Sequence, residues 1–121
     1  MEKILKSLPI YLQLANLFYE KLANGEWKCG QKLPAVREMA AEYGVNPNTL
    51  QRAFGQLERD GYLYTVSTNG RFVTQKEEKL KTLRRRMGQR KIADCIGALE
   101  ALGYSRQEIG EMMQEELADR A

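Results

Sequence analysis

The sequence predicts a mainly α-helical chain with one small β-hairpin, on the basis of three observations. Apolar residues recur at helical spacing over most of the 121 residues. Residues 62–74 are instead rich in β-branched and aromatic side chains, and they contain the Asn69-Gly70 pair that favours hairpin turns. The hydrophobic and charged shares, 43% and 29%, are those of a folded chain rather than a disordered one.

The first helix is predicted over residues 9–24. Pro9 suits the first helical turn because its missing N–H would be unpaired there in any case. Asn24-Gly25 should end the helix, since glycine readily adopts the left-handed conformation found after helices. The apolar face expected to turn inward consists of Ile10, Leu14, Leu17, Phe18 and Leu22. Residues 26–32 should follow as an extended connection.

Two further helices are predicted close together. The first covers residues 35–43 and stops at Gly44, and the second begins about three residues later with Asn46 as N-cap and Pro47 in its first turn. The inward stripe of the second consists of Leu50, Ala53, Phe54 and Leu57. Two helices joined by a short turn that contains glycine predict a helix-turn-helix, and the hairpin directly behind them predicts a wing.

Residues 76–121 predict two more helices, and the chain is therefore divided into a winged helix-turn-helix domain, residues 8–75, and a helical dimerisation region, residues 76–121. Gly103 should end the first helix, and Ser105 with Glu108 should form a capping box at the start of the second. The apolar surface of these helices exceeds what a monomer tolerates, so we expect a homodimer. The alternative is that they fold back on their own winged helix. The expected dimer contacts are Leu80, Leu83, Ile92, Ile96, Leu99, Ile109, Met112, Met113 and Leu117.

Charge is unevenly distributed along the chain. Residues 76–91 contain eight Lys and Arg against two acidic residues, whereas residues 92–121 contain two against seven. The basic band, residues 76–91, indicates a polyanionic partner, and the acidic tail, residues 92–121, indicates a different role. A solvated helix face is the alternative interpretation of the Arg84-Arg85-Arg86 run.

Several classes of function are disfavoured by composition. The chain has no histidine, which excludes Ser-His-Asp or Cys-His catalysis and nitrogen ligation of a metal. Cys29 and Cys95 stand far apart, and we expect two ordinary buried or half-buried thiols. We therefore expect no enzyme, no metal and no cofactor. The absence of a long apolar run and of secretory features near Met1 predicts a cytoplasmic protein without a membrane partner.

The third predicted helix has the side chains expected of a DNA-reading helix. With its apolar stripe turned inward, Asn48, Thr49, Gln51, Arg52 and Gln56 remain on the other faces. Asparagine and glutamine can form paired hydrogen bonds with adenine, and arginine can do so with guanine. The free N–H groups at the start of the helix, near Asn46, suit a phosphate. The alternative is an ordinary amphipathic helix with solvent-facing amides.

Four motifs in order resemble the GntR-type winged helix-turn-helix, over roughly residues 9–74. They are Gly30-x-Lys32-Leu33-Pro34-Ala35-x-Arg37-Glu38, Gly44-Val45-Asn46-x-Asn48-Thr49, Ala53-x-x-x-Leu57-Glu58-x-x-Gly61 and Gly70-Arg71-Phe72-Val73. The short, wholly helical remainder leaves no room for a sensory domain. In this respect the chain is most similar to the YtrA-like subfamily.

The resemblance implies a homodimeric, sequence-specific repressor that binds double-stranded DNA at an imperfect inverted-repeat operator. In the YtrA-like group the regulated operon often encodes a membrane transporter. The alternative function is a winged-helix protein-interaction module without DNA binding, which predicts a neutral or acidic third helix. No polar cluster predicts a pocket for a small-molecule effector, so that partner stays unassigned.

The resemblance also implies which residues contact DNA. They are Arg37 and Asn46, the helix residues Asn48, Thr49, Gln51 and Arg52, and the wing residues Asn69, Gly70 and Arg71. The family's wing usually reads Arg-Gly-x-Gly-Thr. Residues 67–71 of this chain lack its first arginine and first glycine and have Arg71 in place of the threonine. The resemblance therefore predicts DNA contact by the helix, but it does not predict that this wing inserts into the minor groove.

Overall fold

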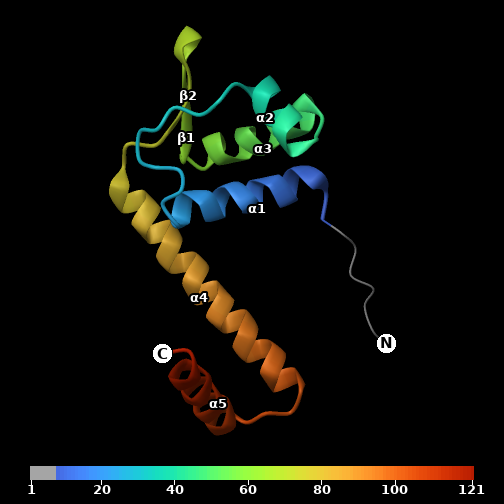
Figure 1. Cartoon of the computed structure of the whole chain (residues 1–121), viewed down its shortest axis with the longest axis vertical. Helices are drawn as coiled ribbons and strands as arrows, with labels where there is room; N and C mark the ends of the chain where they lie inside the picture. The colour runs from blue at the N-terminus through green and yellow to red at the C-terminus, as the bar shows by residue number, and fades with distance from the viewer. Residues whose placement is uncertain (1–7) are drawn as a thin grey trace. The chain divides into compact units, whose positions relative to one another are not determined.

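A computed structural model describes residues 8–121, which form two compact units that divide between Arg84 and Arg85. The predicted mainly α-helical fold with a single hairpin is confirmed. The first unit contains α1 (Ile10–Ala23), α2 (Val36–Tyr43), α3 (Pro47–Arg59), β1 (Leu63–Val66), β2 (Gly70–Val73) and the start of α4 (Glu77–Ala101) (Figure 1). The second unit contains the rest of α4 and α5 (Arg106–Asp119). No helix of residues 8–121 combines the length and apolarity needed to cross a membrane.

Helix α1 packs against α3 through a narrower apolar face than the sequence predicts. Its buried residues are Leu14, Ala15, Phe18 and Leu22. Ile10 and Leu17, which were expected on the inward face, are exposed because they lie at the margins of this strip. Pro9 precedes the helix as its N-cap, and its carbonyl accepts hydrogen bonds from the N–H groups of the first turn.

An aromatic cluster forms the centre of the first unit. Phe18 of α1 stacks on Trp27 with ring centroids 4.9 Å apart and lies 5.2 Å from Phe54 of α3. All three side chains are buried. Trp27 was expected only as part of an extended connection, yet it supplies one side of this core. Since Phe54 belongs to the buried face of α3, the cluster fixes how α3 presents its opposite face.

The turn between α2 and α3 and the start of α3 follow the predicted pattern. Gly44 has φ of +66°, a left-handed conformation that ends α2 without the steric cost a larger residue would have. Asn46 is the N-cap of α3, and Pro47 occupies its first turn. The four predicted inward residues of α3, Leu50, Ala53, Phe54 and Leu57, are all buried.

Strands β1 and β2 form an antiparallel hairpin in which Leu63 pairs with Val73 and Val66 pairs with Gly70. The turn between them is a short 3₁₀ segment, Ser67–Asn69. The expected Asn-Gly turn therefore does not form at Asn69-Gly70, because Gly70 is the first residue of β2, with φ of +111°. In Figure 1 the tip of the hairpin projects away from α1.

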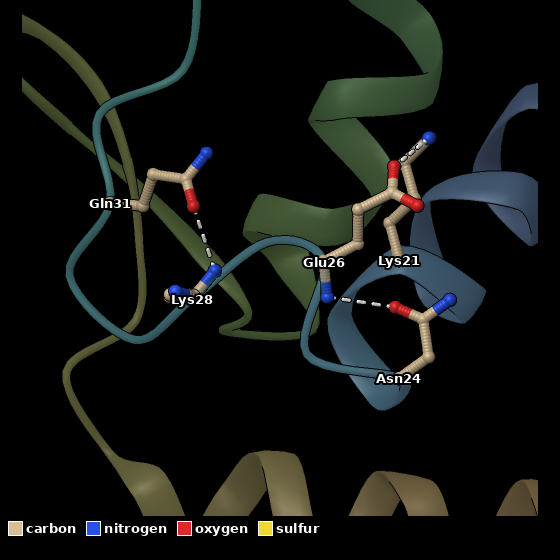
Figure 2. Close-up of polar contacts among 5 residues, drawn as sticks. All are labelled: Lys21, Asn24, Glu26, Lys28 and Gln31. Atoms are coloured by element: carbon tan, nitrogen blue, oxygen red, sulfur yellow. Dashed lines mark hydrogen bonds and ion pairs between the residues drawn. The ribbon is translucent and has the colours of Figure 1, made fainter.

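The connection after α1 is ordered by its own side chains (Figure 2). The Asn24 side-chain oxygen accepts a hydrogen bond of 2.8 Å from the Glu26 N–H, and the Gln31 side-chain oxygen accepts one of 2.9 Å from the Lys28 N–H. Lys21 forms an ion pair with Glu26. These contacts stabilise a segment that then runs along the outer side of the hairpin.

Residues 31–33 pair with β2 and act as a short third strand. The Leu33 N–H donates to the Arg71 carbonyl at 2.9 Å, and the Val73 N–H donates to the Gln31 carbonyl at 2.9 Å. Between them, Lys32 forms a bridge with Phe72. The backbone of β2 is consequently hydrogen-bonded on both sides, by β1 and by this segment.

The first turns of α4 belong to the winged helix, which corrects part of the predicted dimer surface. Leu80 and Leu83 are buried within the first unit rather than available to a second chain. Lys79 donates a hydrogen bond of 2.6 Å to the Asp60 carbonyl and lies over the ring of Tyr62. This part of α4 therefore folds back on its own winged helix, which was the alternative to a dimer contact. The compact first unit extends to Arg84, beyond the expected boundary at residue 75.

The second unit contains the predicted capping box. The Glu108 N–H donates to the Ser105 hydroxyl oxygen at 3.1 Å, while the Ser105 N–H donates to the Glu108 carboxylate at 2.9 Å. Only Ile109 among the described residues 85–121 is buried. The remaining predicted dimer residues are half-buried, as Ile96, Leu99, Met112 and Met113 are, or exposed, as Ile92 and Leu117 are.

Both cysteines are exposed, which corrects the expectation of buried or half-buried thiols. Cys29 lies in the connection after α1, where its thiol donates a hydrogen bond of 3.1 Å to the Thr74 carbonyl. Cys95 lies on α4 in the second unit. The expectation relied on the general tendency of cysteine to be buried. That tendency does not hold at these two positions, where the side chains are exposed.

Candidate nucleic-acid interface

Helix α3 presents a polar face opposite its buried stripe. Asn48, Gln51 and Arg52 are exposed, and Thr49 is half-buried. The side-chain oxygen of Asn46 accepts a hydrogen bond of 2.7 Å from the Asn48 N–H, so this predicted contact residue serves as the helix cap. Amide and guanidinium groups on one outward face, near a helix N-terminus, can donate to base edges and to phosphate oxygens.

Arg52 is held by α1. The guanidinium carbon of Arg52 lies 3.8 Å from the centre of the Tyr11 ring, within the range of a cation–π contact. Tyr11 is half-buried and offers a ring face close to the surface. Arg52 therefore has a defined direction before any partner binds.

Glu58 joins α3 to the hairpin. A single carboxylate oxygen, Oε1, accepts a hydrogen bond of 2.5 Å from the Thr65 hydroxyl of β1 and one of 2.7 Å from Nε of Arg71 on β2. Thr65 and Arg71 are direct cross-strand partners, so the two donors reach the carboxylate from neighbouring strands. We call Glu58, Thr65 and Arg71 the helix–wing triad.

The helix–wing triad favours a charged Glu58. Partial burial raises the pKa of the Glu58 carboxyl, but the hydrogen bonds from Thr65 and Arg71 and the positive charge of Arg71 outweigh it. The pKa therefore lies below its ordinary value. An ionised carboxylate strengthens both hydrogen bonds and keeps the hairpin attached to α3.

Arg71 points inward rather than toward the wing tip. Its side chain is only 14% exposed, and its guanidinium carbon lies 4.8 Å from the centre of the Phe54 ring. Its Nη1 donates a long hydrogen bond of 3.5 Å to Oε1 of Gln51. Arg71 and Gln51, both predicted to contact DNA, therefore contact each other. The Arg71 side chain does not extend into the solvent near Asn69 at the wing tip.

The wing tip has another basic residue beside it. Asn69 is exposed, and Gly70 is so close to Lys32 that an added Cβ would meet Cε of Lys32 at 3.2 Å. Lys32 is itself exposed. It therefore places a positive charge next to the hairpin turn, where the sequence motif lacks the family's arginine.

Arg37 in the first turn of α2 is exposed, and residues 8–121 provide it no ion-pair partner. Arg37 therefore forms no salt bridge to Glu42 or to acids near Glu38 within this part of the chain. An exposed and unpaired guanidinium is suited to a phosphate or a base edge.

Sequence reasoning missed Tyr11, Lys32, Glu58 and Thr65 as parts of this surface. Tyr11 and Lys32 lie far along the chain from the residues that they contact. Glu58 is only 7 residues from Thr65 and 13 from Arg71, but these partners belong to strands and not to its own helix, so helical spacing did not signal them. The hairpin register is the one signal that could have helped, because it places Thr65 opposite Arg71. Among residues 8–121 no group of Cys, Asp and Glu side chains is arranged to hold a metal ion.

Comparison with known proteins agrees with this geometry. Residues 10–73 match the description "Bacterial regulatory proteins, gntR family". The HTH-type transcriptional regulator YhcF of Bacillus subtilis is 36% identical over 103 residues, which cover 85% of each chain. The HTH-type transcriptional repressor YtrA of the same organism is 39% identical over 69 residues, 57% of this chain and 53% of YtrA.

Solved structures are similar over both units and over the winged helix alone. A GntR family transcriptional regulator from Listeria monocytogenes has a TM-score of 0.83 and 28% identity, covering 93% of this chain and 98% of that one. The DNA-binding domain of AraR, solved in complex with operator ORR3, has a TM-score of 0.53 and 31% identity, covering 61% of this chain and 93% of that one. This chain belongs to the gntR family of bacterial regulatory proteins and is a DNA-binding transcription regulator with a winged helix-turn-helix.

Proposed function

We propose that the chain is a homodimeric repressor that binds an imperfect inverted-repeat operator. One observation carries the proposal: α3 exposes Asn48, Gln51 and Arg52 on the face opposite its buried stripe. The AraR DNA-binding domain, to which the first unit is similar, was solved bound to its operator. By this likeness α3 is the recognition helix, inserted in the major groove with its N-terminal turns toward the bases.

The dimer is supported by the apolar surface of the second unit. Ile92 is 58% exposed, Leu102 is 75% exposed and Leu117 is 69% exposed. With Tyr104, which is 37% exposed, these are four exposed large apolar side chains in the second unit. They are more than a solvated segment of this length needs, and a second copy of the chain would cover them. Because Leu80 and Leu83 are buried in the first unit, the proposed interface lies within residues 85–121.

Two arguments support repression: the expected symmetry of the operator, and the name of a related protein. A dimer presents two identical recognition helices in opposite directions, so its operator should share that symmetry. YtrA is named a transcriptional repressor, and the YtrA-like resemblance supports control of an operon, such as one for a membrane transporter. A regulator of chromosomal DNA works in the bacterial cytoplasm, which we propose as the location of this chain.

Duplex binding by the intact protein tests the proposal. Sites selected from a random duplex pool should contain inverted repeats, and binding to them should weaken steeply with added salt. Asn48→Ala should reduce the preference for the selected site over a scrambled duplex, whereas the matched exposed amide variant Gln114→Ala in α5 should not. A chain that selects no sequence would favour the protein-interaction alternative.

The homodimer has a separate test. Leu117→Glu should convert a dimer into a monomer in light scattering, since it places a charge on the proposed interface. Gln114→Glu, on the same helix, should leave the mass unchanged. A monomeric unsubstituted chain would contradict the proposed homodimer directly.

A further inference from the structure

The side-chain amide of Gln51, on the exposed face of α3, forms a hydrogen bond with Arg71 of the wing. Its Oε1 accepts the 3.5 Å hydrogen bond from Nη1 of Arg71. A guanidinium has donors only, so the amide must turn its oxygen toward Arg71. The amide NH₂ group, with two donors, then stays free for a base, while Oε1 keeps a single unused lone pair.

Arg71 is well fixed for this role. Its Nε is bound to Glu58 at 2.7 Å, and its guanidinium lies against the Phe54 ring. Its backbone is paired with Thr65 in β1, and its carbonyl accepts from the Leu33 N–H. A side chain held at so many points cannot turn easily to follow a different orientation of Gln51.

We propose that Arg71 is a positioning residue that sets the base preference of Gln51, and that Gln51 consequently favours guanine over adenine. Guanine presents two acceptors in the major groove, N7 and O6, which match the two N–H donors of the amide. Adenine presents N7 and the N6 amino donor, and glutamine reads it by using Oε1 as the acceptor. That pairing requires Oε1 to accept from Arg71 and from the adenine N6 group at once, with only its second lone pair left to meet the base.

The inference rests on the proposed function, since it concerns operator reading by α3. It adds to the resemblance rather than following from it, because Arg71 stands where the family's usual wing has threonine. A threonine at this place in β2 is too short to reach from the strand to both Glu58 and Gln51. The base preference that we infer is therefore particular to a wing with arginine here.

The test measures which base is chosen, not only how tightly DNA is bound. Sites are selected from a random duplex pool with the intact wild-type protein and with Gln51→Ala, and the base pair whose preference disappears is the one read by Gln51. Wild type should prefer guanine there over adenine, on the order of tenfold. Arg71→Met, which keeps a long unbranched side chain without donors, should move that ratio toward adenine.

Two controls separate positioning from other effects. Arg59→Met removes an exposed arginine from the last turn of α3 and should keep the guanine preference. In the Gln51→Ala background, Arg71→Met should cause no further change in base preference. A remaining effect there would mean that Arg71 reads the base itself, and the inference would be wrong.

The remaining outcomes are also decisive. If Arg71→Met does not fold by circular dichroism, Arg71→Lys replaces it: the ammonium keeps a charge beside Glu58 but lacks the planar fork that reaches two acceptors. An unchanged guanine preference in the folded variant overturns the inference while leaving the proposed function intact. A wild-type protein that selects no sequence overturns the proposed function itself.

Discussion

The guanidinium of Arg52 on α3 lies over the ring of Tyr11 on α1, with 3.8 Å between the guanidinium carbon and the ring centre. An arginine on a free helix surface samples many rotamers, and ordering it on binding costs free energy. The Tyr11 ring reduces that cost because it defines the direction of Arg52 beforehand. Helix α1 thus contributes to the candidate DNA interface without needing to touch DNA.

Tyr11→Ala should weaken operator binding by about twofold to fivefold, as expected for the loss of a cation–π contact of roughly 0.5–1 kcal/mol. Fluorescence anisotropy with a labelled operator duplex measures the change. Tyr11→Phe keeps the ring and should bind like the unsubstituted protein. Equal losses for both variants would show that the tyrosine hydroxyl, and not the ring beneath Arg52, is responsible.

Asn46→Ala should destabilise the first unit by about 1 kcal/mol, because it removes the acceptor that caps the Asn48 N–H. Urea unfolding followed by circular dichroism measures this free energy. Asn46→Asp retains an acceptor at the same place and should keep most of the stability. If Asn46→Ala lowers DNA affinity with no change in unfolding, Asn46 acts as a contact residue and not as a cap.

The stability of the first unit should depend on pH through Glu58. Since the pKa of Glu58 in the folded chain lies below its ordinary value of 4.5, its contribution is fully present above that value. The contribution is lost as the pH falls from there through the lowered, folded-state pKa. Urea unfolding at a series of acidic pH values should show a smaller loss for Glu58→Gln, which cannot titrate, than for the unsubstituted chain. Parallel pH profiles for the two proteins would rule out this role of the carboxylate.

The spacing of operator half-sites should be fixed. Insertion of five base pairs between them rotates one half-site by about half a turn to the opposite side of the duplex, and tight binding should disappear. Insertion of ten restores the side but lengthens the span by about 34 Å, which a dimer of this size should not bridge. Gel-shift titration of the three duplexes measures both effects. Unchanged affinity after the five-pair insertion would mean that the two recognition modules bind independently.

Local patterns in the sequence were sufficient to predict most of the secondary structure. The cap and first turn of α3, Asn46 and Pro47, are short-range features with a direct steric and hydrogen-bonding cause, and both were predicted correctly. The same holds for the capping box at Ser105 and for the helix stop at Gly44. Each of these depends only on residues within one or two helical turns.

The errors concern contacts between residues that are distant in sequence. An apolar stripe on α4 does not reveal that Leu80 and Leu83 are covered by their own unit while Ile92 is exposed. Likewise, a basic residue near a hairpin turn gives no indication that its guanidinium is bound to a glutamate of α3. Which partner a side chain finds depends on the tertiary packing, and periodicity carries no information about that.

Because Glu58 receives its two hydrogen bonds from neighbouring strands, α3 and the hairpin are linked and should be exchanged between proteins as one part. Grafting residues 46–59 alone into another winged helix would leave Thr65 and Arg71 behind, and the transplanted Gln51 would be free to turn. We expect such a hybrid to keep the fold of its host but to read a different operator. A graft that extends through residue 73 should carry the original choice of bases with it.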